Sequence, residues 1–165
     1  MGLISRREFL AAFPAVQAAR RTPSKAQQYP TELRRYSDPL TDREVWRLTG
    51  ASTPHHLPYS HQRFVAHNNS FLLLGGEREG SPQVLRMELP SGRMAQLSRG
   101  PGVEISSLCL APDERSFFFL QGGTLKQVGL RTLKEREIYM VEDGWLATGD
   151  LGISIDGRYA ALVEM

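Results

Sequence analysis

The stretch Asp113-Glu114-Arg115-Ser116-Phe117 places a polar turn directly ahead of an apolar run that continues to Leu120. The same order occurs in Asn68-Asn69-Ser70-Phe71-Leu72 and in Asp156-Gly157-Arg158-Tyr159-Ala160. The three turns begin 45 and 43 residues apart, at positions 68, 113 and 156. A recurrence of about 40–45 residues with four short strands per unit is typical of the blades of a β-propeller.

Short apolar runs separated by turn residues fill the chain around these three turns. No segment of ten residues after Tyr36 keeps a helical period of 3.6, so the sequence predicts an all-β fold. We predict a partial β-propeller with WD40-like or TolB-like repeats, made of two blades and the start of a third. A two-sheet sandwich is the alternative, but it would show the turns without the long-range recurrence. The predicted strands are Phe71–Leu74, Val84–Leu89, Arg93–Leu97, Leu108–Ala111, Ser116–Leu120, Leu125–Val128 and Arg136–Tyr139.

The length of 165 residues would suit one domain, but two blades are too few for a closed propeller. Propellers close with about four to eight blades, and the last residues, Tyr159–Met165, stop inside an apolar strand. We therefore expect the N-terminal part of a longer propeller.

Composition excludes several classes of protein. The 20 basic and 18 acidic residues give a net charge of +2, which is too weak to indicate nucleic-acid binding. One cysteine rules out an internal disulfide framework, and no apolar run approaches the 18 residues that a membrane-spanning helix needs.

The first residues have the layout of an export signal. Ser5-Arg6-Arg7-Glu8-Phe9-Leu10 precedes a weakly apolar run, Ala11–Ala19, with small residues near Val16-Gln17-Ala18. This order is similar to a twin-arginine signal, and the alternative is an amphipathic first helix with a basic end. We predict a signal and linker over residues 1–26, with a polar linker from about Arg20 to Pro30, and a propeller portion over 27–165. The expected location is periplasmic or exported, with a cytoplasmic location as the alternative.

Four histidines lie close together in the sequence, which raises the possibility of a metal site. His61 and His67 are expected on or beside one strand, whereas His55 and His56 are expected in a loop between two prolines. Neither a helical H-x-x-x-H pair nor an acidic partner at a diagnostic spacing is present, so solvated loop histidines are the favoured interpretation.

Three other features that could carry chemistry or binding are better explained, or equally well explained, by structural roles. Cys109 lies in mid-strand with no basic neighbour in sequence, which predicts a buried, inert thiol. Gly100-Pro101-Gly102 lacks the Lys-Ser/Thr of a phosphate-binding loop and predicts a turn. Trp145 fits either a sugar-stacking platform or a residue packed between blades. No catalytic and no metal-binding residue is assigned from the residues themselves.

A series of motifs spans about 120 of the 165 residues, and it consists of Thr41–Thr49, His56–Gln62, Ala95–Gly100, Leu110–Arg115, Leu130–Tyr139, Gly144-Trp145 and Ala161–Glu164. The more specific elements are the His-x-x-Tyr unit of His56–Gln62 and the spacing from Ile138-Tyr139 to Gly144-Trp145. In this order the motifs resemble those of the oligogalacturonate lyases, a family of seven-bladed, pectin-degrading propellers.

The resemblance implies a carbohydrate lyase that cleaves oligogalacturonides, including unsaturated ones, by metal-assisted β-elimination in pectin catabolism. The family uses manganese or another divalent metal, but its ligands, three His and a Gln, and its base lie in later blades. No cofactor is therefore expected in this portion, which should be inactive alone. His56, Tyr59 and Gln62 match the family's first-blade element and are candidate substrate-binding residues, and Arg63 could pair with a substrate carboxylate.

The alternative interpretation is a non-catalytic exported β-propeller that binds a glycan or a protein partner. Both interpretations imply a carbohydrate or protein ligand, no nucleic acid, and no integral membrane segment after signal removal.

Overall fold

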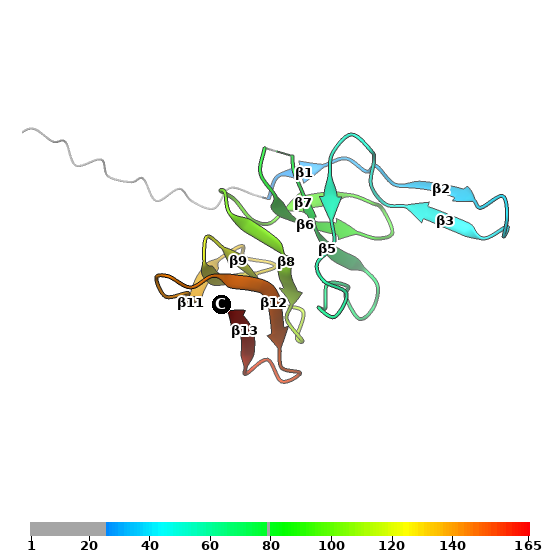
Figure 1. Ribbon diagram of the computed structural model, residues 1–165. Helices are drawn as coiled ribbons and strands as arrows, with labels where there is room; N and C mark the ends of the chain where they lie inside the picture. Colours follow the sequence, from blue (N-terminus) through cyan, green and yellow to red (C-terminus); the bar gives the residue numbers. More distant parts are fainter. Residues whose placement is uncertain (1–25, 79) are drawn as a thin grey trace, which may run out of the picture.

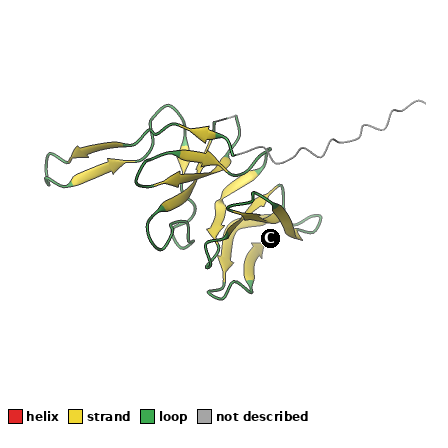
Figure 2. Cartoon of the chain, turned by 180° about the vertical axis from the view of Figure 1, so that it is seen from behind, coloured by secondary structure: helices red, strands yellow, loops and turns green. Residues whose placement is uncertain are grey.

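The computed structural model describes residues 26–78 and 80–165, so the predicted export signal lies outside the described residues. Within these ranges the chain forms strands, turns and loops, without a helix (Figures 1 and 2). The strands are β1 (Gln28–Tyr29), β2 (Arg34–Ser37), β3 (Glu44–Arg47), β4 (His55–His56), β5 (Phe71–Gly76), β6 (Gln83–Glu88), β7 (Met94–Gln96), β8 (Val103–Leu110), β9 (Ser116–Gln121), β10 (Thr124–Gly129), β11 (Glu135–Met140), β12 (Ala147–Ile153) and β13 (Ala160–Glu164).

These strands form two antiparallel blades and the first half of a third. The first sheet has the order β1-β7-β6-β5-β4, the second has β11-β10-β9-β8, and β12 pairs with β13 (Figure 1). The seven strands predicted from the sequence correspond to β5 through β11. The predicted all-β partial propeller is therefore confirmed. None of the described residues forms a helix that is long and apolar enough to cross a membrane.

The continuous apolar runs arise because each blade is covered on both faces. Phe71 and Leu73 of β5 face the second blade and pack in one core with Phe117 and Phe119 of β9. The alternate residues of β5 belong to a core on the other face of the first blade. In the same way, Phe118 packs toward β12. A strand that is buried on both faces has no polar alternation, which explains the runs at 71–74 and 117–120.

The turn between the first two blades is where sequence predicted it. Gly100 and Gly102 have φ values of 82° and 81°, between β7 and β8. This region of backbone space is open to glycine and strained for most other residues. The prediction of a turn at Gly100-Pro101-Gly102 is confirmed.

The segment before the first blade is more ordered than the predicted linker. β1 pairs with β7, with Gln28 opposite Ala95. The prediction of a linker that extends to Pro30 is therefore wrong for Gln28 and Tyr29, which form a strand. The sequence gives little sign of β1, because it has two residues and its partner lies far along the chain. The β2–β3 hairpin was also not predicted, and it projects away from the blades (Figure 1).

Candidate functional site

The innermost strand of the first blade is interrupted by a long bulge. His56 pairs with Gly75, and Val65 bridges to Leu72 on the same strand, β5. Eight residues, 57–64, therefore lie opposite only two, 73 and 74. Bulges redirect side chains and are common beside active sites. We call residues 57–64 the inner loop, and it carries most of the predicted substrate-binding residues.

The histidines occupy different elements from those expected. His55 and His56 form β4, whereas His61 lies in a turn of the inner loop. The prediction of a loop at 55–56 is wrong, because pairing with Gly75 and Gly76 fixes this short segment as a strand. The prediction of a strand at or beside His61 is also wrong, because His61 lies in the turn of the inner loop. The flanking prolines lie just outside the two-residue strand, so they remove none of its hydrogen bonds.

Gln62 is a buried anchor for the inner loop. Its side chain is 5% exposed, and its Nε2 donates hydrogen bonds to the carbonyl oxygens of Gly149 (3.0 Å) and Leu151 (3.3 Å). Its Oε1 accepts a hydrogen bond from the backbone N–H of Tyr59 at 3.2 Å. Both N–H donors are thus used to tie the loop to β12. In the structure Gln62 is a positioning residue, and its role toward a ligand stays a prediction.

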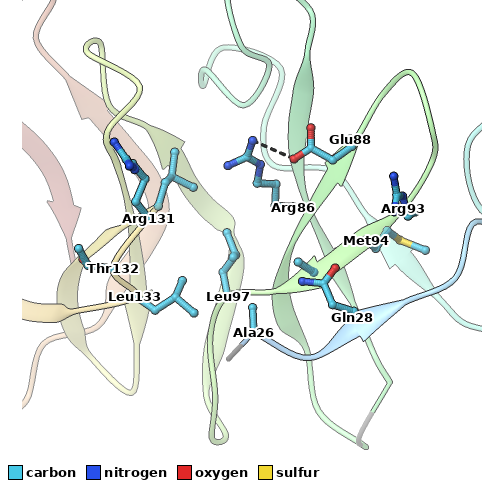
Figure 3. Close-up of a pocket in the computed structure, with 12 residues that line it drawn as sticks. Ala26, Gln28, Arg86, Glu88, Arg93, Met94, Leu97, Arg131, Thr132 and Leu133 are labelled. Atoms are coloured by element: carbon cyan, nitrogen blue, oxygen red, sulfur yellow. Dashed lines mark ion pairs between the residues drawn. The ribbon is translucent and has the colours of Figure 1, made fainter. Parts of the chain in front are cut away.

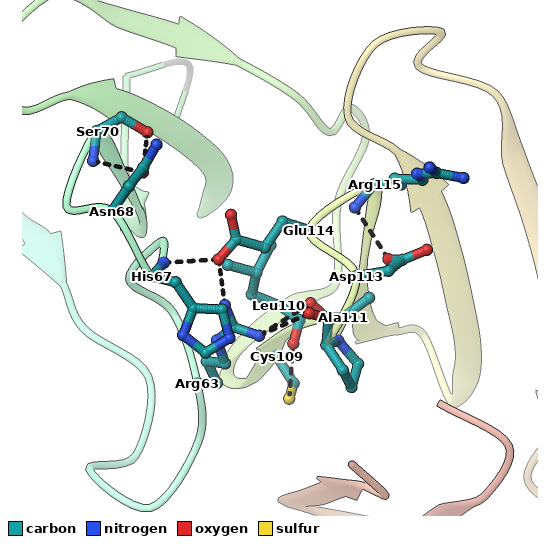
Figure 4. A network of polar contacts seen from close by, with 11 residues as sticks. Arg63, His67, Asn68, Ser70, Cys109, Leu110, Ala111, Asp113, Glu114 and Arg115 are labelled. Atoms are coloured by element: carbon teal, nitrogen blue, oxygen red, sulfur yellow. Dashed lines mark hydrogen bonds and ion pairs between the residues drawn. The ribbon is translucent and has the colours of Figure 1, made fainter. Parts of the chain in front are cut away.

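Arg63 is likewise engaged within the chain. Its guanidinium forms an ion pair with Glu114 and donates to the carbonyl oxygens of Pro112 (3.0 Å) and Ala111 (3.4 Å) (Figure 4). Glu114 also accepts a hydrogen bond from the backbone N–H of His67 at 2.6 Å. The network joins the inner loop to the second blade. Because its charge is paired with that of Glu114, Arg63 is a poor source of a free positive charge, and its role toward a substrate stays a prediction.

Tyr59 and His61 form the exposed part of the inner loop. Their rings stack with centroids 5.7 Å apart and an interplanar angle of 21°, and Tyr59 is 47% exposed. His61 Nε2 lies 3.6 Å from Asp150 Oδ1, on the bulge of β12. On β4, the exposed His56 places its Nε2 3.4 Å from Glu77 Oε1. We call Tyr59, His61 and His56 the rim residues.

The innermost strands of the next two units are bulged as well, and the bulges meet. In β8 four residues, 105–108, oppose one residue of β9, and in β12 three residues, 148–150, oppose one residue of β13. A Cβ built on Gly149 would lie 2.6 Å from Cβ of Ser106. Only glycine fits there, so close contact between the two bulges positions the backbone that Gln62 binds.

His55 faces a different, half-buried cluster. Its Nε2 lies 3.4 Å from a guanidinium nitrogen of Arg78, which also contacts Glu32 Oε1 at 2.6 Å. Burial and the nearby Arg78 lower the pKa of His55, so the neutral ring is favoured. Burial opposes ionisation of Glu32, but hydrogen bonds from the Gly50 N–H and Arg78 outweigh it and lower the pKa of Glu32. Through these contacts Arg78 links His55 on β4 to Glu32.

A separate cleft lies between the first blade and the β10–β11 turn of the second. Its volume is about 720 Å³, and Arg86, Arg93 and Arg131 line it (Figure 3). Arg86 forms an ion pair with Glu88 at 2.8 Å. None of the candidate residues predicted from the sequence lines this cleft.

Cys109 belongs to the core rather than to a site. Its side chain is buried against the third unit, and burial raises the pKa of the thiol. The prediction of a buried thiol is confirmed. Trp145 is 54% exposed in the loop before β12.

The comparisons with known proteins agree with the order of motifs in the sequence. A family model described as oligogalacturonate lyase matches residues 23–163. The chain belongs to the oligogalacturonate lyase family. The oligogalacturonate lyase of Dickeya dadantii (strain 3937) is 32% identical over 115 residues, which are 69% of this chain and 30% of that relative. The chain thus spans about a third of the curated relatives that it matches.

Solved structures support the same family and fold. An oligogalacturonate lyase in complex with manganese matches with a TM-score of 0.76 and 30% identity, covering 81% of this chain and 36% of that one. A putative TolB from Agrobacterium tumefaciens matches with a TM-score of 0.54 and 15% identity, covering 74% and 44%, which indicates a shared fold alone.

The described residues do not fit a manganese ion by themselves. Manganese prefers oxygen and imidazole ligands gathered at one point. In the ranges 26–78 and 80–165, no group of three or more His, Cys, Asp or Glu side chains is arranged to hold a metal ion. His56 and His61 each approach one carboxylate instead, Glu77 and Asp150 respectively.

Proposed function

We propose that this protein acts in the cleavage of oligogalacturonides, as the first blades of a carbohydrate lyase. The observation that carries the proposal is the family match over residues 23–163, together with 30% identity to a solved oligogalacturonate lyase. The chain covers about a third of its relatives, so the proposal concerns binding by these residues and catalysis by the whole enzyme.

The rim residues would bind and orient the substrate. The exposed Tyr59–His61 stack offers an aromatic face to a pyranose ring, as aromatic side chains combine an apolar face with a polar group. The exposed imidazole rings of His56 and His61 could donate ring N–H hydrogen bonds to a uronate carboxylate. Gln62 and Arg63 would act beneath the rim by holding the inner loop against the neighbouring strands.

The chemistry that we propose is β-elimination next to a uronate carboxylate. The solved relative is in complex with manganese, and a divalent metal held by the whole enzyme would supply charge stabilisation for removal of the ring proton beside the carboxylate. The described residues contribute binding and orientation, and we assign to them neither the base nor the metal ligands.

The sequence around Arg6-Arg7 supports a second part of the proposal, which is export by the twin-arginine route. An exported enzyme would act on oligogalacturonides in the periplasm. Replacing both residues by lysine (Arg6→Lys with Arg7→Lys) should retain the protein in the cytoplasm if this is correct. Unchanged fractionation would contradict export by this route.

The enzymatic proposal is tested with unsaturated digalacturonate. The full gene product is incubated with this substrate, with and without manganese, while the ultraviolet absorbance of the unsaturated bond is followed. We expect a manganese-dependent loss of absorbance, and we expect none from the 165-residue chain alone. Binding of digalacturonate by the full gene product without any loss of absorbance would contradict the lyase and favour a glycan-binding propeller.

A further inference from the structure

The cleft between the first two blades has an excess of positive charge. Arg86 on β6 and Arg93 just before β7 line it from the first blade, and Arg131 lines it from the β10–β11 turn of the second. Among the described residues that line the cleft, Glu88 is the one with a carboxylate. The two sheets contain five and four strands, so the cleft lies between blades that are each complete.

Two of these three arginines have no anionic partner within residues 26–78 and 80–165. Arg86 is paired with Glu88, and its guanidinium lies 4.1 Å from the centroid of the Phe71 ring. Arg93 and Arg131 are exposed, and neither side chain forms an ion pair within these ranges. They lie on opposite sides of the cleft (Figure 3). A guanidinium binds a carboxylate through paired, charge-assisted hydrogen bonds, so the cleft offers two such positions to an anionic ligand.

Apolar side chains lie between the charged groups of the cleft. Leu97 belongs to the core between the two blades, and Leu133 packs against that core. Both leucines lie between Arg131 and the arginines of the first blade (Figure 3). Ala95, which lies opposite Arg86 on β7, has a short side chain that leaves the space beside it open. The volume of about 720 Å³ is within the range of ligand pockets, which is about 300–1,000 Å³.

This combination of groups suits an acidic oligosaccharide. A uronate chain carries a carboxylate on each sugar, and the C–H groups of each pyranose ring can pack on apolar side chains. A single phosphate or sulfate would use the guanidinium groups but not the apolar side chains between them. The ligand class is therefore an oligogalacturonide, which is the substrate of the proposed function on which this inference rests.

We propose that the cleft is a second binding site for oligogalacturonides, in which Arg93 and Arg131 bind carboxylates of the chain and a sugar ring packs on Leu97 and Leu133. The sheet order β1-β7-β6-β5-β4 places the cleft at the outer strands of the blade and the rim residues at its inner edge. A substrate chain in the cleft therefore leaves the rim residues free. Retention of substrate at the second site raises its effective concentration at the rim.

Nuclear magnetic resonance of the labelled 165-residue chain, titrated with trigalacturonate in the absence of manganese, tests the second site. We expect saturable shifts at Arg93 and Arg131, separate from those at Tyr59 and His61. The double variant Arg93→Gln with Arg131→Gln loses two charge-assisted contacts. It should bind trigalacturonate at the cleft about tenfold more weakly, as followed at the amide of Ala95.

The matched control is Arg43→Gln with Arg136→Gln, which removes the same charge from two exposed arginines that do not line the cleft. It should leave the affinity of the cleft unchanged. Because all four substituted side chains are exposed, both double variants should unfold at the temperature of the parent. Maltotriose, a neutral trisaccharide, and inorganic phosphate should cause no comparable shifts at Ala95.

Equal weakening in the two double variants, the absence of saturable shifts at the cleft, or equally tight binding of phosphate or maltotriose would overturn the second site. Shifts at Tyr59 and His61 with none at the cleft would overturn the second site alone and leave the proposed function standing. Cleft shifts in a protein whose full gene product does not cleave digalacturonate would contradict the lyase and leave the second site standing.

Discussion

Replacing Gln62 by alanine should loosen the inner loop and destabilise the fold measurably. The substitution removes two hydrogen bonds to the carbonyl oxygens of Gly149 and Leu151 and one from the N–H of Tyr59. A net value of about 1 kcal/mol for each bond gives roughly 3 kcal/mol. Water can replace part of the lost hydrogen bonding at the exposed end of the loop. We therefore expect the free energy of unfolding to fall by about 2 kcal/mol. For a domain of this size that corresponds to a decrease of about 4–8 °C in Tm.

The assay is thermal unfolding of the parent, of Gln62→Ala and of a control, Gln127→Ala. Gln127 donates one hydrogen bond, to Ser116 Oγ at 3.0 Å, between neighbouring strands of the same sheet. Loss of this one hydrogen bond in Gln127→Ala should lower the free energy of unfolding by less than half as much as Gln62→Ala does. Hydrogen exchange should also become faster at residues 57–62 and 148–151 in Gln62→Ala alone. Equal decreases in Tm for the two variants, with unchanged exchange in these segments, would refute the anchoring role of Gln62.

Two further predictions concern the contacts around the inner strands. Gly149→Ala should lower the free energy of unfolding by about 1–3 kcal/mol, because its Cβ would come within 2.6 Å of Cβ of Ser106. Gly152→Ala, where the new Cβ meets its nearest atom at 3.9 Å, should change it little, and equal effects would contradict the close approach of the bulges. Because burial and Arg78 lower the pKa of His55, the unfolded state takes up the proton first as pH falls below about 6.5. Stability should therefore decrease from pH 7 toward pH 5.5, and His55→Gln should reduce that decrease in chemical unfolding experiments; an unchanged slope would contradict it.

The blades could be predicted from the sequence because their signals are local. The turn before each second strand and the apolar run after it lie within a few residues of each other, as in Asp113–Leu120. The hairpin β2–β3 and the strand β1 escaped prediction for a physical reason. Their residues are polar or exposed, and β1 is ordered by pairing with β7 more than 60 positions away.

The candidate site could be predicted only in part. The sequence predicts binding residues at His56, Tyr59, Gln62 and Arg63, and the structure places His56 on β4 and the other three in the inner loop. It could not distinguish the exposed Tyr59 from the buried Gln62, because burial follows from contact with Gly149, 87 residues away. The pairing of Arg63 with Glu114, 51 residues away, is similarly invisible in the sequence. The sequence favours solvated histidines over a metal site, and none of its motifs links His61 to Asp150.

Tyr59 and His61, at the exposed surface of the inner loop, should bind oligogalacturonide. Titration of the isotopically labelled 165-residue chain with digalacturonate, followed by nuclear magnetic resonance, tests this binding most directly. We predict saturable shifts at Tyr59 and His61 that Tyr59→Ala abolishes and that Tyr139→Ala, at an equally exposed tyrosine on β11, leaves unchanged. The absence of shifts at these two residues, or shifts at His61 that persist in Tyr59→Ala, would contradict the account.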